Sequence, residues 1–365
     1  MSTFRRLRNR LLGSPRFQRF AATFPLTRPI ARRQSRVLFD LCAGFVYTQV
    51  LYACVKLELL TLLELRGPLT LSDLAVELDL PQDRLVVLLR AAVALRLLDR
   101  CGADGFDLGA RGAMLLGNPG ATAMIRHHAL FYQDLADPLA LLSGGGTDLA
   151  SYWGYAGSDD PGGLDATAVG AYSELMATSQ TLIADLILSA YPCHRHRRLL
   201  DVGGGLGAFV AAVAERCPKL ALEMLDLPPV AAAARSSLEA RGLGDRIDVH
   251  GGDAFRDPLP TGADLVTLVR IVHDHDDAAV LALLTRIRAA LPASGALLIA
   301  EPMAETRGAE AMGDAYFGFY LLAMGSGRPR TRARLEQLLR EAGFRRIREQ
   351  RTANPLLVRV LVART

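Results

Sequence analysis

The sequence predicts an α/β protein: a Rossmann-like domain at residues 191–365, preceded by a mostly helical, winged-helix-like domain at residues 37–118. Three observations support this prediction. An apolar strand ends at Asp201 and runs through glycines into a helix, later apolar strands alternate with helical segments, and 50% of the 365 residues are hydrophobic. Alternating strands and helices are typical of a parallel sheet covered by helices. A chain of this length has room for two domains.

The glycine-rich turn after the first strand is the most informative segment. Asp201 precedes the run Gly203–Gly205, and a helix is expected from Ala208. Glycine is needed where backbone approaches a ligand closely or takes a positive φ. The spacing also satisfies the dinucleotide pattern, so NAD or FAD is an alternative ligand. A carboxylate at Asp201 suits an ammonium group better than a pyrophosphate, which favours a ligand with an amino-acid moiety.

Two further carboxylates follow later strands at intervals that suit adenosine. Strand 220–225 ends at Asp226, whose carboxylate can accept hydrogen bonds from ribose hydroxyls. Strand 247–250 leads to Asp253, which can accept from the amino group of adenine, while Phe255 can stack on the ring. The predicted cofactor-binding residues are Asp201, Gly203, Gly205, Asp226, Leu227, Asp253, Ala254, Phe255 and Arg270.

These motifs resemble those of a known enzyme family. The glycine turn with Asp201 resembles motif I of the class I S-adenosylmethionine (SAM) methyltransferases, which implies SAM as cofactor. The segment 270–277 resembles the His-Asp-Trp motif of the O-methyltransferases typified by plant caffeate and isoflavone enzymes, with His275 in place of Trp. The resemblance implies that His273 is the general base and that Glu301 orients it. It also implies a seven-stranded sheet, closed by a hairpin at 345–351 and 356–363.

One departure from the family concerns the support of His273. The family's later Gly-Gly-Lys-Glu-Arg-Thr is represented here by residues 325–331, where Pro329 replaces a second orienting Glu. Acid support for His273 therefore rests on Glu301 or Asp274. The predicted catalytic residues are His273, Asp274 and Glu301.

Neither the histidines nor the cysteines predict a metal site. The pair His273 and His275 and the pair His194 and His196 have no third ligand at motif spacing, and the five cysteines contain no Cys-x-x-Cys. Scattered cysteines in odd number favour the reducing cytosol over a disulfide framework. The sequence shows neither a membrane-spanning apolar run nor a signal-peptide core, so we expect a cytoplasmic protein.

Residues 1–36 form a strongly basic N-terminal arm. They contain ten arginines and no acidic residue, although the whole chain has a net charge of only +4. Apolar side chains such as Phe4, Leu7 and Phe20 lie between the arginines. Such a segment can bind the surface of a membrane that contains anionic lipid. The alternative is an arm that packs on a partner subunit.

The winged-helix pattern at residues 37–118 allows two interpretations. A capping box at Thr70 and Asp73 and a helix from Pro81 to Arg96 precede a short hairpin. The pattern is typical of ligand-responsive transcriptional regulators, but the arginines of the predicted helix form no basic face. In the methyltransferase family the same module is a dimerisation domain. We therefore expect a homodimer that does not bind nucleic acid.

The segment 119–190 is expected to form a roof over the active site, and residues 312–324 a second apolar wall. Many aromatic and methionine side chains favour a large apolar acceptor over a small polar one. The motif Tyr172-x-x-x-Met176 resembles a substrate-side motif of the family. The predicted substrate-binding residues are His127, Phe131, Tyr132, Trp153, Tyr172, Met176, Phe317, Tyr320 and Met324.

Several segments resemble one branch of the family, the bacterial carotenoid O-methyltransferases. They include residues 6–11, 14–19, 24–33, 43–47 and 312–318. This branch acts on 1-hydroxy carotenoids such as hydroxyneurosporene and demethylspheroidene, which implies methyl transfer to a tertiary hydroxyl. Related branches methylate bacteriochlorophyllide or phenols, and these acceptors are the alternatives.

Overall fold

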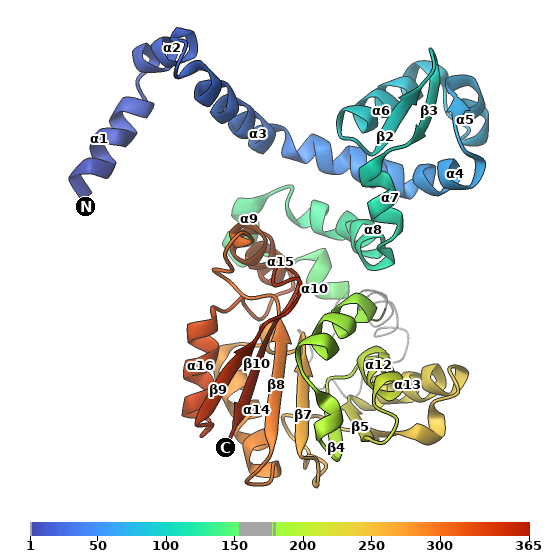
Figure 1. The fold of residues 1–365 in the computed structure, drawn as a ribbon, viewed down its shortest axis with the longest axis vertical. Helices are drawn as coiled ribbons and strands as arrows, with labels where there is room; N and C mark the ends of the chain where they lie inside the picture. Colours follow the sequence, from blue (N-terminus) through green and yellow to red (C-terminus); the bar gives the residue numbers. More distant parts are fainter. Residues whose placement is uncertain (1, 153–176, 178–179) are drawn as a thin grey trace. The chain divides into compact units, whose positions relative to one another are not determined.

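The computed structural model describes residues 2–152, 177 and 180–365, and the chain divides into two compact units, Met1–Gly117 and Asn118–Thr365 (Figure 1). The predicted Trp153, Tyr172 and Met176 lie outside the described residues. Helix α3 (Arg28–Lys56) continues across the boundary expected between residues 36 and 37. No proline or glycine lies between Pro29 and Gly44, so nothing in the sequence breaks the helix at residues 36 and 37.

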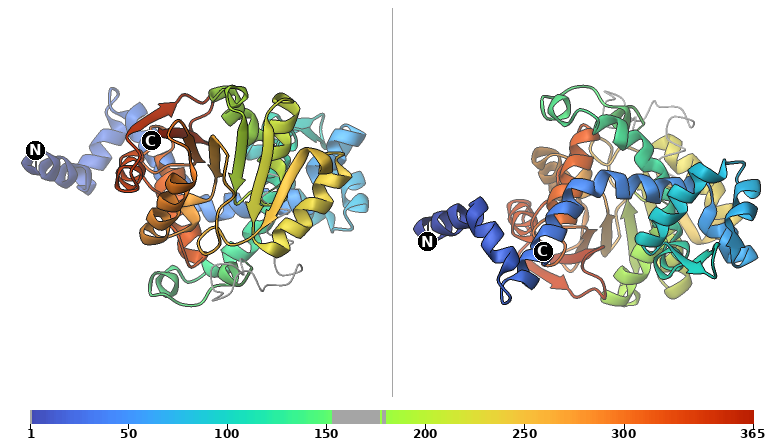
Figure 2. Two further views of the ribbon diagram at one scale, coloured as in Figure 1. Left: turned by 90° about the horizontal axis from the view of Figure 1, so that it is seen from below. Right: turned by 90° about the horizontal axis from the view of Figure 1, so that it is seen from above.

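The first unit begins with three successive helices and ends with a small winged module. The basic arm of residues 1–36 contains α1 (Ser2–Leu12), α2 (Pro15–Thr23) and the start of α3, which are drawn in blue in Figure 2. The module contains α4 (Leu59–Arg66), α5 (Leu71–Glu77), α6 (Gln82–Ala94), α7 (Ala110–Leu116) and an antiparallel sheet of β1 (Leu69–Thr70), β2 (Leu98–Cys101) and β3 (Gly105–Leu108).

The winged module has its own apolar core. Leu59, Leu74, Leu89 and Phe106 are among its fully buried side chains. The predicted capping box opens α5: Thr70 Oγ1 accepts from the N–H of Asp73, and the Asp73 carboxylate accepts from the N–H of Thr70. This reciprocal pair satisfies two amide groups that a helix start otherwise leaves without partners.

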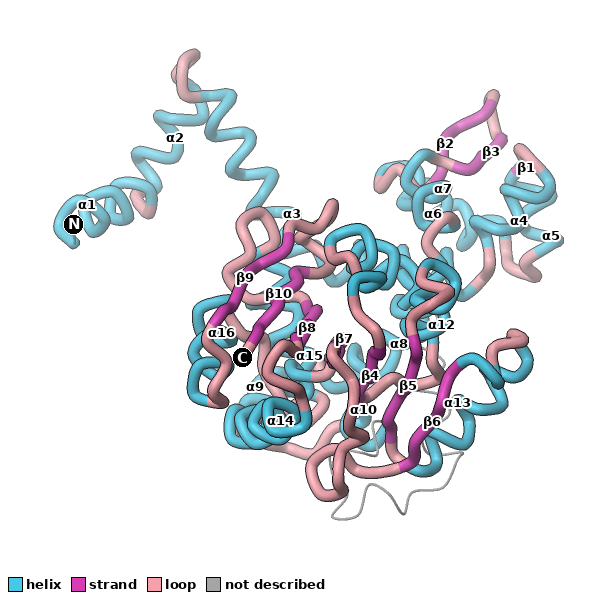
Figure 3. The backbone as a smooth tube through the Cα atoms, turned by 60° about the horizontal axis from the view of Figure 1, so that its bottom comes forward, coloured by secondary structure: helices cyan, strands magenta, loops and turns pink. Residues whose placement is uncertain are grey.

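The second unit is built on a seven-stranded sheet, which confirms the predicted fold class (Figure 3). The strands are β4 (Arg198–Val202), β5 (Ala221–Asp226), β6 (Ile247–Gly251), β7 (Leu265–Val269), β8 (Ala296–Glu301), β9 (Arg346–Gln350) and β10 (Arg359–Arg364). Their order is β6-β5-β4-β7-β8-β10-β9. The first five are parallel, and β10 pairs antiparallel with both β8 and β9.

Helices cover both faces of this sheet. One apolar core joins it to α12 (Ala208–Arg216), α13 (Pro228–Ala240) and the helix Gln180–Ala190, and a second joins it to α14 (Asp277–Ala290) and α16 (Arg332–Glu341). A further apolar cluster joins α8 (Pro119–Asp134), α9 (Pro138–Leu142), α10 (Asp148–Tyr152) and α15 (Phe317–Ala323). Burial on both faces explains why β7 and β8 are apolar almost throughout.

Candidate functional site

A cavity of about 240 Å³ opens at the carboxyl ends of the parallel strands. The chain runs outward from β4 to β6 and then returns to β7 beside β4. This arrangement places the topological switch point between β4 and β7, where open α/β sheets bind their ligands. The lining residues are Ala177, Gln180, Val202–Leu206, Ala208, Leu225–Leu227, Val230, Gly252–Phe255, Val269–Ile271, Asp274, His275 and Leu283.

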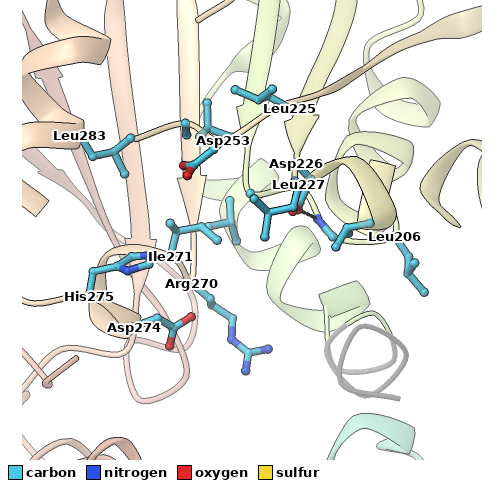
Figure 4. A pocket seen from close by; sticks show the side chains of 18 of the residues that line it. Leu206, Leu225, Asp226, Leu227, Asp253, Arg270, Ile271, Asp274, His275 and Leu283 are labelled. Carbon is cyan, nitrogen blue, oxygen red and sulfur yellow. Dashed lines mark hydrogen bonds between the residues drawn. The ribbon is translucent and has the colours of Figure 1, made fainter. Parts of the chain in front are cut away.

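Asp226, at the end of β5, borders the cavity and is held by two backbone amides (Figure 4). The N–H of Gly205 donates to its Oδ2 at 2.7 Å, and the N–H of Leu227 donates to its Oδ1 at 2.8 Å. Burial raises the pKa of Asp226 to about 6, although both hydrogen bonds favour the ionised form. The carboxylate keeps lone pairs that a ligand diol can use.

The glycine turn packs tightly against the segment that follows β7. Gly203 has a φ of +74°, and a Cβ there would lie 2.4 Å from Cδ1 of Ile271. Both the backbone conformation and the close approach therefore require glycine at this position. The turn therefore lies against Ile271, and both segments line the cavity.

Asp201 lies behind the turn and is not among the lining residues of the cavity. Its side chain is buried, and its Oδ1 accepts from Thr267 Oγ1 at 2.6 Å. Burial raises the pKa of Asp201 to about 7, and the nearby Asp226 acts in the same direction. Asp201 therefore links the end of β4 to β7 through Thr267. Its direct contact with a ligand ammonium group stays a prediction.

The loop after β6 brings Asp253, Ala254 and Phe255 to the cavity. Asp253 Oδ1 accepts from the N–H of Phe255 at 2.8 Å, which fixes the carboxylate at the start of the loop. The Phe255 ring packs edge-on against His275, with 4.7 Å between the ring centroids. His275 therefore forms part of the wall on which a flat base can rest.

Arg270 follows β7 and lines the cavity in a strained conformation. Its φ is +60°, a left-handed value that is uncommon for a residue with a Cβ. Such strain persists where surrounding structure imposes it, and it is frequent at functional sites. Here the strain accompanies the turn of the chain from β7 toward His273.

His273 is buried next to the lining residue Asp274, and its imidazole lies between two carboxylates. Its Nε2 lies 3.1 Å from Asp274 Oδ1, and its backbone N–H donates to Glu301 Oε1 at 3.0 Å. Glu301 Oε2 lies 4.0 Å from His273 Nδ1, which is ion-pair distance and too long for a hydrogen bond. Burial lowers the pKa of His273, but Asp274 and then Glu301 outweigh it, so the pKa is raised above its ordinary value.

These residues fit an adenosine ligand with an amino-acid tail better than a dinucleotide. Asp226 offers acceptors for a ribose diol, Asp253 for an adenine amino group, and Arg270 a cation for a carboxylate. A pyrophosphate would need free backbone amides at the glycine turn. The amide of Gly205 already donates to Asp226.

Comparison with known proteins identifies the family. A family model described as the O-methyltransferase domain matches residues 134–345, and one described as the O-methyltransferase dimerisation domain matches residues 39–118. The chain belongs to the O-methyltransferase family. It is therefore a SAM-dependent methyltransferase. Its winged module is a dimerisation domain, which supports a homodimer. This result rules out the NAD, FAD and transcriptional-regulator alternatives.

Relatives and solved structures agree with this assignment. The methyltransferase is 45% identical to demethylspheroidene O-methyltransferase of Cereibacter sphaeroides over 94% of this chain and 90% of the relative. It is 40% identical to the enzyme of the same name from Rhodobacter capsulatus, over 97% and 88%. The structure of mitomycin 7-O-methyltransferase superposes with a TM-score of 0.75 at 26% identity, covering 93% of this chain and all of the other.

The predicted substrate-binding residues that the structure describes lie on or next to α8 and α15, and none of them is among the lining residues of the cavity. His127 Nε2 lies 3.0 Å from Tyr320 Oη, and the Phe131 ring packs edge-on against Tyr320. Met324 is fully buried in the same cluster. Phe317 lies closest to the catalytic segment, with its ring centroid 6.0 Å from that of His273. Tyr132 lies beside His128, with 6.0 Å between the ring centroids.

One polar pair between these helices, His128 and Tyr316, was not predicted from the sequence. His128 Nε2 lies 2.8 Å from Tyr316 Oη, at the end of a π-helical segment at Ala311–Tyr316. Tyr316 and Tyr320 stack one helical turn apart, so their spacing of four residues was a usable signal. The partner His128 could not be deduced, because it lies 188 residues away in the chain.

The described residues show no group of three or more His, Cys, Asp or Glu side chains that could hold a metal ion. By length and composition, α3 is the one described helix that could cross a membrane. A helix that packs against a second subunit passes the same test. Most of α3 lies within the matched dimerisation domain, so packing against a second subunit also explains why this helix is apolar.

Proposed function

We propose that the methyltransferase acts on the tertiary 1-hydroxyl of an acyclic hydroxy-carotenoid, of the demethylspheroidene or hydroxyneurosporene type. Two relatives named demethylspheroidene O-methyltransferase match nearly the whole chain at 45% and 40% identity, and this observation supports the proposal most strongly. The hydrocarbon chain of the acceptor is proposed to lie along the apolar cluster of α8 and α15, which contains Phe131, Tyr320 and Met324.

His273 is the proposed general base. When bound, SAM would supply an electrophilic methyl group on its sulfonium and leave as S-adenosylhomocysteine when the methyl–sulfur bond breaks. Asp226, Asp253 and the glycine turn would hold it. A tertiary alcohol is far less acidic than an imidazolium ion. His273 would therefore remove the hydroxyl proton during methyl transfer and not beforehand. Asp274 and Glu301 stabilise the resulting imidazolium, because both carboxylates lie within ion-pair distance of the ring.

The acceptor is tested by offering labelled SAM with three classes of alcohol or pigment. We expect label transfer to a 1-hydroxy carotenoid dispersed in detergent, and much slower transfer to bacteriochlorophyllide or to a phenol. Transfer to a phenol or chlorophyllide with none to the hydroxy-carotenoid would refute the proposed acceptor and leave the methyltransferase assignment intact.

The pH dependence of turnover is expected to depend on Asp274. A base acts in its neutral form, so a raised pKa of His273 moves the rising limb of the pH profile to higher pH. Asp274→Asn removes the main cause of that elevation. We expect the rising limb of kcat to shift to lower pH in this variant, as measured by initial rates across pH 5.5–9. An unshifted limb would show that another group sets the profile.

The basic arm is proposed to bring this cytoplasmic enzyme to the membrane that holds its apolar substrate. Phe4, Leu7 and Leu11 recur at helical spacing on α1 and are exposed, as are Phe20 on α2 and Phe24 directly after it. Arginines occupy the intervening positions, so each helix can bury an apolar face while its cations meet anionic lipid. The Rhodobacter capsulatus alignment spans 97% of the chain and so includes most of this arm.

Replacing Arg5, Arg6, Arg8 and Arg10 by Gln is expected to weaken binding to anionic vesicles. Each basic residue near such a surface contributes about 1 kcal/mol. Cosedimentation with phosphatidylglycerol vesicles measures the effect, and binding should also fall with added salt. A control variant replaces four exposed arginines of the other unit, at positions 345, 346, 348 and 351.

The alternative role of the arm is subunit exchange. Unchanged vesicle binding together with loss of the dimer in the Arg-to-Gln variant would refute membrane docking and favour that alternative. Analytical ultracentrifugation distinguishes the two results.

A further inference from the structure

The segment 326–330 holds four consecutive backbone carbonyls around His273. Arg330 Nη1 donates to the carbonyl of Val272 at 2.7 Å, and Arg330 Nη2 donates to that of His275 at 2.6 Å. Between them, the N–H of Arg328 donates to the carbonyl of His273 at 2.9 Å, and Ser326 Oγ donates to that of Asp274. No carbonyl from 272 to 275 is left without a donor from this segment.

The guanidinium that spans this array is itself fixed. The Arg330 side chain is 1% exposed, and its Nε donates to Asp277 Oδ1 at 2.7 Å. Arg330 therefore uses donors on all three nitrogens in one rigid plane. A lysine ammonium has no such fork and cannot reproduce this geometry.

Gly327 allows the segment to lie against the catalytic backbone. Its φ is +81°, and a Cβ there would lie 2.1 Å from the carbonyl oxygen of His273. Any side chain at this position would push the two segments apart. The array of four hydrogen bonds thus depends on glycine as well as on Arg330.

Both polar backbone groups of His273 are consequently held, its N–H by Glu301 and its carbonyl by Arg328. We propose that Arg330, together with Ser326 and the Arg328 amide, is a positioning device for His273. It fixes the backbone from which the imidazole projects between Asp274 and Glu301. The inference rests on the proposed role of His273 as base.

The test replaces Arg330 by Met, with Arg334→Met as the matched control. Arg334 also pairs with Asp277, at 2.8 Å, but donates to none of the four carbonyls. We expect Arg330→Met to lower kcat by about 10²-fold, the typical cost of a small misplacement of a catalytic group. SAM affinity by calorimetry should be unchanged. The rising limb of the pH profile should move to lower pH, because the imidazole loses its fixed contact with Asp274.

Two further variants make the test decisive. Arg330→Lys should fail to restore kcat, although it keeps the charge. Ser326→Ala removes one hydroxyl donor from a partly exposed site, and we expect about a fivefold loss of kcat, the increment of one hydrogen bond. Ser326→Ala still tests the proposal if Arg330 variants do not fold. The arrangement is not a positioning device if Arg330→Met or Ser326→Ala folds with wild-type kcat and pH profile.

A double-mutant cycle with His273→Ala separates this inference from the proposed function. If Arg330 acts through His273, Arg330→Met costs nothing further in the His273→Ala background. If His273→Ala is slow and Arg330→Met has the same cost in both backgrounds, the base proposal stands and the positioning proposal is wrong. A fully active His273→Ala refutes the base proposal on its own.

Discussion

Replacing His273 by Ala is expected to lower kcat by about 10²–10⁴-fold, the usual contribution of a general base. SAM affinity should be unchanged, because His273 is not among the residues that line the cavity. Single-turnover assays with labelled SAM measure the chemical step, and calorimetry measures binding. His194→Ala removes an exposed imidazole elsewhere in the same unit and serves as the control.

Two results would change the role given to His273. Wild-type turnover in His273→Ala would refute the role of the imidazole as base, because the substitution keeps the backbone hydrogen bond to Glu301 and removes only the side chain. A parallel loss of SAM affinity would show that the substitution disturbs the turn at Arg270 and not the proton transfer.

Replacing Asp226 by Ala is expected to weaken SAM binding by about 1.5–3 kcal/mol, the range for hydrogen bonds to a charged group. Part of this loss is expected because the substitution also removes the carboxylate that accepts the hydrogen bond from the Gly205 amide. Asp248→Ala, at an exposed position on β6, is the control. The wild-type protein should bind SAM and S-adenosylhomocysteine but not NAD in the same calorimetric experiment.

The pKa of Asp226 adds a second measurement to this prediction. Its pKa is raised to about 6, so the carboxylate is ionised above that pH and protonated below it. Ribose hydroxyls donate more strongly to the ionised form. SAM affinity should therefore fall as the pH decreases from 7.5 to 5.5, and Asp226→Asn should flatten this dependence. Equal slopes in the two proteins would assign the titration to another group.

The cofactor side of the site could be predicted from the sequence because its residues follow strand ends. Asp226, Asp253 and the glycine turn lie at fixed intervals in an alternating pattern, and parallel strands bring their carboxyl ends to one edge. The capping box at Thr70 was likewise predictable, because both partners lie within one helical turn.

Contacts between distant segments could not be predicted in this way. Nothing in the sequence pairs His128 with Tyr316 or Arg330 with the carbonyl of Val272, because such contacts depend on how loops pack after the sheet has formed. The burial of Asp201 behind the turn is a similar case. Its spacing indicates closeness to the glycines, but its hydrogen bond to Thr267 on β7 decides which way the carboxylate points.

The two imidazole–phenol pairs, His127 with Tyr320 and His128 with Tyr316, have a consequence for the proposed acceptor. Burial lowers the pKa of His127 to about 4 and also lowers that of His128, so both rings are neutral at physiological pH. The roof thus offers hydrogen bonds without any ionic group on these rings. The acceptor in the proposed function is a neutral polyene alcohol, so contact with these two rings would bring no ion against its hydrocarbon chain.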